Sequence, residues 1–223
     1  FIVPLLLMLL IKYIFDSLPG LVRLGVRISD YAILFAAYLV HFLAYVLSTI
    51  VLVRDRGSGT LDRMFGYGYR RREIVLGYVA GYSTIAAGQT ALVLFLTGYL
   101  FDVDLLPALG AVIVTMLALA VVSVGLGVFA SNFARNEGQV FPFIPMVSLP
   151  SALLSGIAIP IDDLPRFLQW LSYLVPLRYA VEILQGVLVR QESFFSMWRP
   201  LAALAGVGAA LVASASLTLR ERT

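Results

Sequence analysis

The sequence predicts an all-α polytopic membrane protein, and three observations lead to that prediction. Of the 223 residues, 61% are hydrophobic and 13% are charged, and the mean hydropathy is +0.94. A soluble globular protein carries roughly 25% charged residues, so about half of the usual polar coat is missing. The apolar residues form long runs with the charged residues collected between them. The small net charge of +3 and this arrangement argue against nucleic-acid binding.

Six apolar runs are predicted to be transmembrane helices, because a helix needs roughly 20 apolar residues to cross the hydrocarbon core. The runs cover residues 1–15, 31–53, 74–101, 105–130, 140–161 and 201–219. The first run is short for a crossing, and we expect it to be the remaining part of a span that is truncated in this sequence. The fifth run predicts a bent or broken helix, because it contains Pro142, Pro145, Pro150 and Pro160.

The most charged segment lies between the second and third predicted spans. Six of the 16 basic residues fall within residues 53–74. Residues 57–59 predict a turn, and a short helix is expected over about 60–66, with Asp62 where the helix dipole favours an acid. The helical period places three side chains in one apolar stripe: Leu61, Met64 and Phe65. Two interpretations stay open, a surface helix beside a charge cluster that stops membrane insertion, or a helix that presents its stripe to a soluble partner.

The distribution of arginine predicts the orientation of the spans, since basic residues in short loops mark the cytoplasmic side. If residues 54–73 are cytoplasmic, residues 131–139 and 220–223 are cytoplasmic as well. These three stretches hold nine arginines in about 33 positions, whereas the opposite side holds six in nearly 60. We therefore expect a multi-pass protein of the cytoplasmic membrane with both termini in the cytoplasm.

Residues 162–190, between the fifth and sixth predicted spans, are expected to form a broken re-entrant segment of two short amphipathic helices. Asp162 or Asp163 would cap the first helix, and the second would cover residues 177–189 with Arg178 and Glu182 one turn apart. Irregular backbone at membrane depth must be satisfied by protein or water, so this segment would line an outer gate. A plain interfacial hairpin is the alternative. The candidate gate residues are Pro160, Asp162, Asp163, Pro165, Pro176, Arg178 and Glu182.

Few side chains within the predicted spans suggest chemistry. Cysteine is absent, which excludes disulfides and thiolate metal sites. His41 is the single histidine and has no acidic neighbour in sequence, so an interhelical hydrogen bond is a better interpretation than a metal site or a proton relay. Gln89 is interpreted in the same way. Gly77 and Gly81, one turn apart, predict close helix packing. We expect no catalytic residue and no bound metal.

Two separated motifs stand in order along the chain. Residues 54–63 read Arg-Asp-Arg-Gly-Ser-Gly-Thr-Leu-Asp-Arg, and residues 71–77 add a basic, Glu, hydrophobic, Gly cluster where the third span opens. Residues 135–139 read Arg-Asn-Glu-Gly-Gln, and they are followed by Pro145, Leu154, Ser155, Gly156, Pro160, Leu164, Pro165, Pro176 and Tyr179. This pattern resembles the type-2 ABC transporter permeases of bacteria and archaea over essentially the whole chain. The family often has a proline after the first motif, where this chain has residues 66–69 reading Gly-Tyr-Gly-Tyr.

The resemblance implies a role for the charged loop. Such permeases have no ATPase activity and pair with a separate nucleotide-binding ATPase subunit that binds ATP and Mg. This chain also lacks a G-x-x-x-x-G-K-[ST] phosphate loop, so we expect it to bind no cofactor. Residues 60–66 resemble the coupling helix that sits in a groove of the ATPase, with the apolar stripe as anchor and Arg56, Asp62 and Arg63 at the rim. The candidate coupling residues are Arg56, Thr60, Leu61, Asp62, Arg63, Met64, Phe65, Glu73, Arg135 and Glu137.

The predicted function is the permease subunit of an ABC exporter that moves an amphipathic or hydrophobic cargo, such as a drug, lipid or antibiotic-like molecule. The resemblance implies a second permease copy, as a homodimer or a heterodimer, within the lipid bilayer. An ion-coupled secondary transporter is one alternative, although it needs intramembrane carboxylates that the second to sixth predicted spans lack. A non-transporting membrane scaffold is the other.

Overall fold

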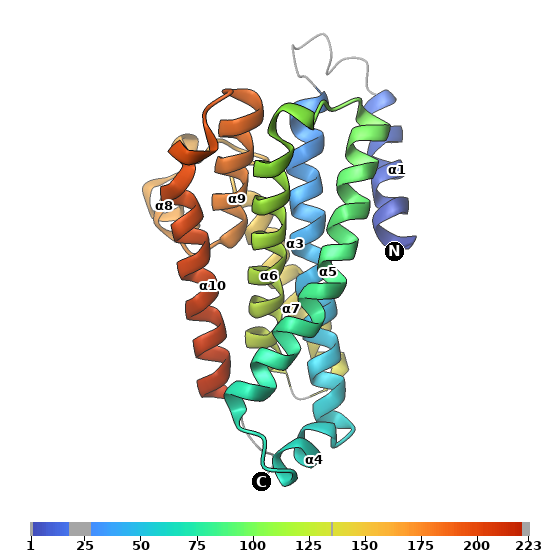
Figure 1. Cartoon of the computed structure of the whole chain (residues 1–223), viewed down its shortest axis with the longest axis vertical. Coiled ribbons are helices and arrows are strands. Elements are labelled where there is room, and N and C mark those ends of the chain that lie inside the picture. Colours follow the sequence, from blue (N-terminus) through green and yellow to red (C-terminus); the bar gives the residue numbers. More distant parts are fainter. Residues whose placement is uncertain (1, 18–27, 135, 220–223) are drawn as a thin grey trace.

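The computed structural model describes residues 2–17, 28–134 and 136–219, and within these ranges it contains helices and no strands. Four of the described helices are long and apolar enough to cross a membrane: Tyr31–Gly57, Arg71–Phe101, Leu106–Ser131 and Phe194–Thr218. The long helices run side by side as a bundle (Figure 1). The predicted all-α membrane class is confirmed, and the count of six spans stays a prediction.

The helices follow one another in a simple order along the chain. They are α1 (Ile2–Asp16), α3 (Ile28–Gly57), α4 (Thr60–Gly66), α5 (Arg71–Phe101), α6 (Leu109–Ser131), α7 (Glu137–Leu154), α8 (Arg166–Ser172), α9 (Pro176–Leu184) and α10 (Trp198–Thr218). Single 3-10 turns occupy Leu106–Ala108, Ile161–Asp163 and Phe194–Met197, and a π turn occupies Gln185–Val189. The short helix α4 lies at one end of the bundle, which we call the α4 end, and α10 also finishes toward it (Figure 1). The stretch from Ser155 to Met197 is called the α8–α9 segment.

Helices α3 and α6 form the centre of the bundle. In each of them 61% of the most apolar stretch is buried, against 44% in α5 and 11% in α10. The two central helices approach closely because α6 has a glycine at their crossing, where a Cβ on Gly127 would lie 2.5 Å from the Tyr45 carbonyl oxygen. Thr49 Oγ1 donates a hydrogen bond of 3.2 Å to the Gly127 carbonyl. Small residues at helix contacts allow this kind of packing in a membrane protein.

Two of the six predicted spans, α1 and α7, are not among the four helices that are long and apolar enough to cross a membrane. Helix α1 has 15 residues and begins about halfway along the bundle (Figure 1). Helix α7 has 18 residues and continues through Pro142, Pro145 and Pro150 before it ends at Leu154. Gly156, with a φ of 88°, takes the left-handed conformation that commonly follows a helix end. The predicted run 140–161 is therefore corrected, since residues 155–160 leave the helix.

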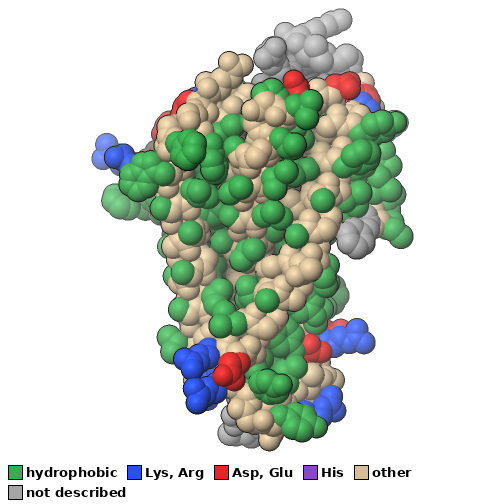
Figure 2. Space-filling view, in the orientation of Figure 1, with side chains coloured by type: hydrophobic (Ala, Val, Ile, Leu, Met, Phe, Trp, Pro, Cys, Tyr) green, Lys and Arg blue, Asp and Glu red, His purple; other side chains and the backbone are tan. Residues whose placement is uncertain are grey.

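The surface of the bundle is apolar between two charged ends. Charged side chains gather at the two ends of the face shown in Figure 2, and the band between them carries hydrophobic side chains and backbone. Large exposed side chains in the described part include Phe95 at 67% and Phe141 at 68%. The 31 residues of α5 extend about 46 Å, more than the roughly 30 Å that a bilayer core needs. This surface suits lipid rather than water.

Candidate coupling site at the α4 end

The charged loop folds as a tight turn that leads into α4. Gly59 stands before the helix with a φ of 73°, a conformation that glycine adopts without steric cost. The hydroxyl oxygens of Ser58 and Thr60 are 2.9 Å apart, and Arg63 Nη2 donates to Thr60 Oγ1 at 3.1 Å. Asp62 lies in the first turn, where the helix dipole favours its charge. The loop is thus ordered by its own local bonds.

The apolar stripe of α4 packs against the chain's own core. Leu61 is 1% exposed and belongs to the main hydrophobic cluster, and Met64 and Phe65 are half-buried against that cluster. These three side chains were predicted to anchor the loop in a partner's groove. Leu61 is thus buried within the chain itself while Met64 and Phe65 keep part of their surface exposed, and an anchoring role for the stripe stays a prediction.

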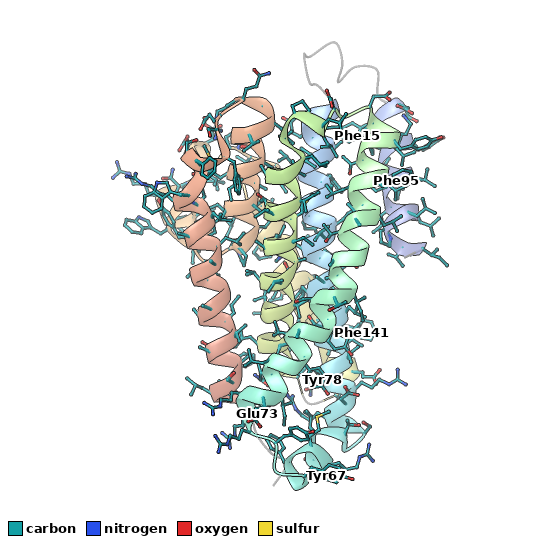
Figure 3. The ribbon with its side chains drawn as sticks, in the orientation of Figure 1. Phe15, Tyr67, Glu73, Tyr78, Phe95 and Phe141 are labelled. Carbon is teal, nitrogen blue, oxygen red and sulfur yellow. The ribbon has the colours of Figure 1, made fainter. Side chains whose placement is uncertain are left out.

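The opposite side of the loop is exposed. The described side chains that face outward there are Asp62, Arg63, Tyr67 and Tyr69, and we call this set the α4 face. Tyr67 is 82% exposed and Tyr69 is 57% exposed, and Tyr67 lies at the extreme end of the molecule (Figure 3). Tyrosine and arginine are enriched at protein–protein interfaces. The α4 face therefore has the composition of a contact surface.

Arg56, in the last turn of α3, holds the C-terminal end of α6. Its Nη1 donates to the carbonyl oxygens of Ser131 at 2.8 Å and Ala134 at 3.2 Å, and its Nη2 donates to Asn132 Oδ1 at 2.9 Å. A helix leaves its last carbonyls unpaired, and a cation near them is favoured by the helix dipole. Arg56 was predicted to lie on the polar rim of a partner contact. Its guanidinium joins two helices of the same chain, and a place at the rim of a partner contact stays a prediction.

The residues next to Arg56 extend this connection to two more helices. The hydroxyl of Tyr78, on α5, donates to Asp55 Oδ2 at 2.7 Å. Asn132 Nδ2 donates to Thr218 Oγ1, on α10, at 2.8 Å. We call Asp55, Arg56, Tyr78, Asn132 and Thr218 the Asp55–Arg56 clamp. It ties the end of α3 to α5, α6 and α10.

Four members of the clamp were absent from the predicted site: Asp55, which stands in the first motif, and Tyr78, Asn132 and Thr218. Tyr78, Asn132 and Thr218 are polar residues near the ends of apolar runs, and this was the only signal in the sequence that pointed to them. Such a position predicts that a side chain can reach the membrane surface, but it does not specify a partner. The partners follow from which helix ends lie together.

The other predicted coupling residues lie nearby but outside the clamp. Glu73 Oε2 accepts a hydrogen bond of 2.8 Å from the Arg70 backbone nitrogen, so it caps the start of α5. Glu137 is exposed in the first turn of α7, whose N-cap Asn136 accepts from the Gln139 nitrogen at 3.0 Å. Arg135 falls outside the described residues. A coupling role for these residues stays a prediction.

In the α8–α9 segment, the two aspartates do not cap a helix. Asp162 and Asp163 belong to a separate 3-10 turn, and the N-cap of α8 is Pro165. Leu164, between the 3-10 turn and Pro165, is extended, with a φ of −78° and a ψ of 150°. A residue before proline is driven out of the helical region. The capping prediction was therefore wrong. Pro176 occupies the first turn of α9, a position that tolerates proline.

Four of the predicted gate residues come together in this segment. Pro160, Asp162, Arg178 and Glu182 line a pocket of about 380 Å³ between the end of α7 and α9. The predicted residues Asp163, Pro165 and Pro176 are not among those that line it. The segment thus holds a small polar cavity, and a gating role for it stays a prediction.

Arg178 bonds within its own segment rather than to Glu182, the residue one turn further along α9. Its Nη1 donates to the Ser172 hydroxyl and, at 3.4 Å, to the Gln169 carbonyl. Its guanidinium lies 3.9 Å from the centre of the Tyr173 ring. Its Nε is buried without a hydrogen-bond partner in the described part of the chain. The arginine therefore fastens α9 to α8.

Tyr179 makes a second connection between α9 and α8. Its hydroxyl donates to the Tyr173 carbonyl at 2.7 Å. Burial raises the pKa of the Tyr179 phenol, and the nearby Arg178 opposes that shift. The phenol therefore stays protonated and able to donate.

The two polar residues predicted to join helices behave differently. His41 is fully buried, with Nδ1 2.7 Å from Ser123 Oγ on α6 and Nε2 3.2 Å from Ser151 Oγ on α7. It therefore bridges three helices. Gln89 is 8% exposed, and its Nε2 has no hydrogen-bond partner among the described residues. The interhelical bond expected from its amide nitrogen is not present there.

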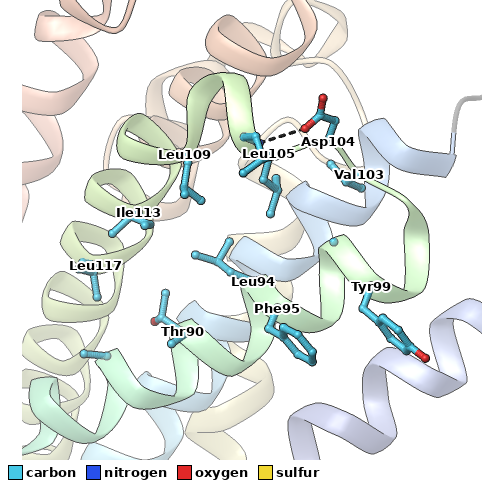
Figure 4. Close-up of a pocket in the computed structure, with 14 residues that line it drawn as sticks. Thr90, Leu94, Phe95, Tyr99, Val103, Asp104, Leu105, Leu109, Ile113 and Leu117 are labelled. Carbon is cyan, nitrogen blue, oxygen red and sulfur yellow. Dashed lines mark hydrogen bonds between the residues drawn. The ribbon is translucent and has the colours of Figure 1, made fainter.

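An apolar cavity of about 770 Å³ lies between α5 and α6, beside the turn that joins them (Figure 4). Its walls are mostly leucine, alanine and aromatic side chains, and Asp104 stands at its edge. The Asp104 carboxylate accepts from the Leu106 nitrogen at 3.1 Å and so caps the turn before α6. With its single carboxylate used in this way, the cavity offers no catalytic arrangement.

Comparisons with known proteins agree with this architecture. The family model described as ABC-2 type transporter matches residues 1–189. The chain is 26% identical over 187 residues to the inner membrane transport permease YhhJ of Escherichia coli, covering 82% of this chain and 49% of YhhJ. It is 24% identical over 156 residues to the probable multidrug ABC transporter permease YbhR of Escherichia coli, covering 70% and 42%.

A third relative is the linearmycin resistance permease protein LnrN of Bacillus subtilis, with 27% identity over 167 residues, 74% of this chain and 43% of LnrN. The chain thus spans less than half the length of each of these three relatives. The family model nevertheless matches most of the chain, from the first residue into the α8–α9 segment. This chain belongs to the ABC-2 type transporter family.

Proposed function

We propose that this chain is the membrane-spanning subunit of an exporter that moves an amphipathic or hydrophobic cargo out of the cell, and that a separate subunit hydrolyses the ATP. Family membership, four long apolar helices and relatives named as multidrug or linearmycin-resistance permeases support the proposal. The proposal includes six spans: the four long apolar helices and, in addition, α1 and α7. It also includes a second permease copy and a cytoplasmic α4 end.

The observation that carries the proposal is the Asp55–Arg56 clamp beneath the exposed loop. Helix α4 follows α3 after a turn at residues 58–59 and leads through residues 67–70 into α5. The clamp joins the end of α3 to α5, α6 and α10 through hydrogen bonds of 2.7 to 2.9 Å. A force on the loop would therefore reach four helices together, as an ATP-driven movement of the spans requires.

The partner contact in this proposal is the α4 face, and the apolar stripe has a different task. With Leu61 in the core, the stripe fixes the loop to the permease. The exposed tyrosines and charges then meet the ATPase subunit. This arrangement separates binding of the partner from transmission of its movement.

Co-purification with the partner ATPase tests the contact. Tyr67 and Tyr99 lie at opposite ends of the bundle and are 82% and 74% exposed, so they form a matched pair. Tyr67→Asp should lower the amount of ATPase retained by about tenfold, because aromatic anchors carry much of an interface's binding energy. Tyr99→Asp should retain the wild-type amount. Equal retention by both variants would contradict the proposed contact.

An ion-coupled transporter makes a different prediction. Such transporters place carboxylates within the membrane, whereas the buried polar side chains of the described residues are His, Ser, Thr and Gln. Export by the purified complex in vesicles should stop when ATP is withheld and continue when a protonophore is added. The reverse result would favour the ion-coupled alternative.

A further inference from the structure

A groove of about 570 Å³ lies between the α4 loop and the beginning of α5. Two carboxyl groups and three aromatic rings line it, those of Asp55, Glu73, Tyr69, Tyr78 and Tyr82. Glu73 and Tyr78 lie at the α4 end of α5 in Figure 3. The groove therefore combines negative charge with aromatic surface at the end of the bundle where α5 begins.

The negative charge of the groove has no cationic partner in the described part of the chain. The ion pairs found there are Lys12–Asp16 and Arg190–Glu192. Asp55 is half-buried and accepts from the Tyr78 hydroxyl, while the guanidinium of its neighbour Arg56 is directed to α6. The arginines at residues 70–72 are not part of the lining. A half-buried carboxylate without a counter-ion is costly unless a cation binds it.

The aromatic wall suits a cation as well. The rings of Tyr78 and Tyr82 are stacked, with centroids 6.0 Å apart and planes 7° apart. The face of a tyrosine ring attracts a cation, and the attraction grows when water is excluded. An anionic ligand would meet two carboxylates and two electron-rich rings. The groove thus selects for positive charge.

Two glycines keep the groove open. A Cβ placed on Gly77 or on Gly81 would meet no atom within 4 Å, so neither glycine makes the expected close helix contact within the described ranges. Both line the groove, and so does Ile85 at its deeper end. From Glu73 to Ile85 the helix rises about 18 Å. The groove therefore runs from charged groups at the α4 end toward apolar side chains at membrane depth.

We infer that this groove binds an amphipathic organic cation. The cationic group lies between the carboxylates of Asp55 and Glu73, and the apolar part lies along Tyr82 and Ile85. The inference rests on the proposed export function and names the chemical class of the cargo. Met64 of α4 and Tyr69 of the following turn line the same groove, so a bound cation contacts the segment that joins α4 to α5.

Binding of tetraphenylphosphonium to the full chain in lipid nanodiscs tests the inference without any nucleotide. Tetraphenylborate has the same shape and the opposite charge, and binding to empty nanodiscs is subtracted for both ions. The phosphonium should bind saturably. Asp55→Asn, which keeps an acceptor for the Tyr78 hydroxyl, should weaken its binding by about tenfold, since one lost charge pair at low dielectric is worth about a decade. Asp102→Asn, an exposed acid at the opposite end of α5 and outside the groove, should leave binding unchanged.

A steric pair of variants tests the location. Gly81→Leu should abolish saturable phosphonium binding because the side chain fills the groove, whereas Gly81→Ala should preserve most of it. Thermal unfolding shows whether both variants are folded. If Gly81→Leu is not folded, the binding measured for Asp55→Asn decides whether the groove is the site. Equal saturable binding of both ions, or wild-type binding by Asp55→Asn or by folded Gly81→Leu, would overturn the inference. The assay contains no ATPase, so its outcome is independent of the Tyr67 co-purification test.

Discussion

The two polar regions of the molecule use their hydrogen bonds in different ways. At the α4 end the bonds of Arg56 and Asn132 join residues 75 to 86 positions apart, on separate helices. In the α8–α9 segment the bonds of Gln169, Arg178 and Tyr179 join residues 5 to 9 positions apart. The side-chain hydrogen bonds of the α4 end therefore join separate helices of the bundle, and those of the α8–α9 segment stay within the segment.

The apolar contacts of the α8–α9 segment agree with this difference. Helix α9 is attached to the bundle by buried side chains such as Leu177 and Ile183, both 0% exposed. Helix α8 instead exposes Trp170 at 74% and Phe167 at 64%. Within the segment, α9 is thus packed into the bundle while much of α8 is exposed, whereas the clamp at the α4 end joins α3, α5, α6 and α10.

The largest loss of stability is expected at the close contact between α3 and α6, near the clamp. In Gly127→Ala the new Cβ would clash with Ser48 Oγ and with the Tyr45 carbonyl, so the variant should lose about 3 kcal/mol of stability or fail to fold. Gly110→Ala is the control on the same helix, because its Cβ meets no atom within 4 Å. Thermal unfolding in detergent measures both. Similar stabilities for the two variants would contradict the close contact.

The second prediction sharpens the comparison between the two arginines. Arg56→Ala should cost about 2–3 kcal/mol because it removes three hydrogen bonds that join α3 to the end of α6 and the residues after it. Amide exchange should then rise in α3, α6 and α10. Arg178→Ala should cost about 1 kcal/mol, with faster exchange confined to α8 and α9. If exchange rises as widely in Arg178→Ala as in Arg56→Ala, the contrast between the two arginines is wrong.

A smaller effect is expected from the hydrogen bond between α3 and α5. Tyr78→Phe removes the bond to Asp55 and should lower stability by about 1 kcal/mol, the usual value for one hydrogen bond. Tyr82→Phe is the control, since the hydroxyl of Tyr82 makes no hydrogen bond in the described part of the chain. Urea or thermal unfolding compares the two. An equal loss in both variants would show that the Asp55 bond contributes little.

The smallest effect is expected on the surface of α8. Trp170→Ala should change the stability by less than about 0.5 kcal/mol, because the side chain is 74% exposed. The same unfolding measurement checks this. A loss as large as that of Tyr78→Phe would mean that α8 packs against something in the assembled protein.

Local features of the sequence predicted most of the helices. The charge-free runs became α3, α5, α6 and α10 with shifted ends, because hydropathy over a long window is the dominant signal for a membrane helix. The short helix α4 follows the predicted turn because Gly59 adopts a positive φ. The ends of α7 and α8 were missed, since Gly156 and Leu164 act through single backbone dihedrals.

The sequence left the contacts of the predicted site residues undetermined, and Leu61 shows why. Its spacing with Met64 and Phe65 established that α4 has an apolar side, but an apolar side can be covered by a partner or by the chain itself. Arg56 shows the same limit for a polar residue. Its motif marked it as important, and its real partners lie 75 and 78 positions away.

By itself, the sequence determined that this protein is a set of apolar helices in lipid with a charged, glycine-bounded loop between two of them. Partition between water and lipid acts on local composition, which can be read along the chain. Only the tertiary structure decided that the loop's stripe faces inward, that Arg56 joins helix ends, and that Asp55 and Glu73 share an open groove. Those outcomes depend on which helices pack together, and a packing partner is a property of the whole fold.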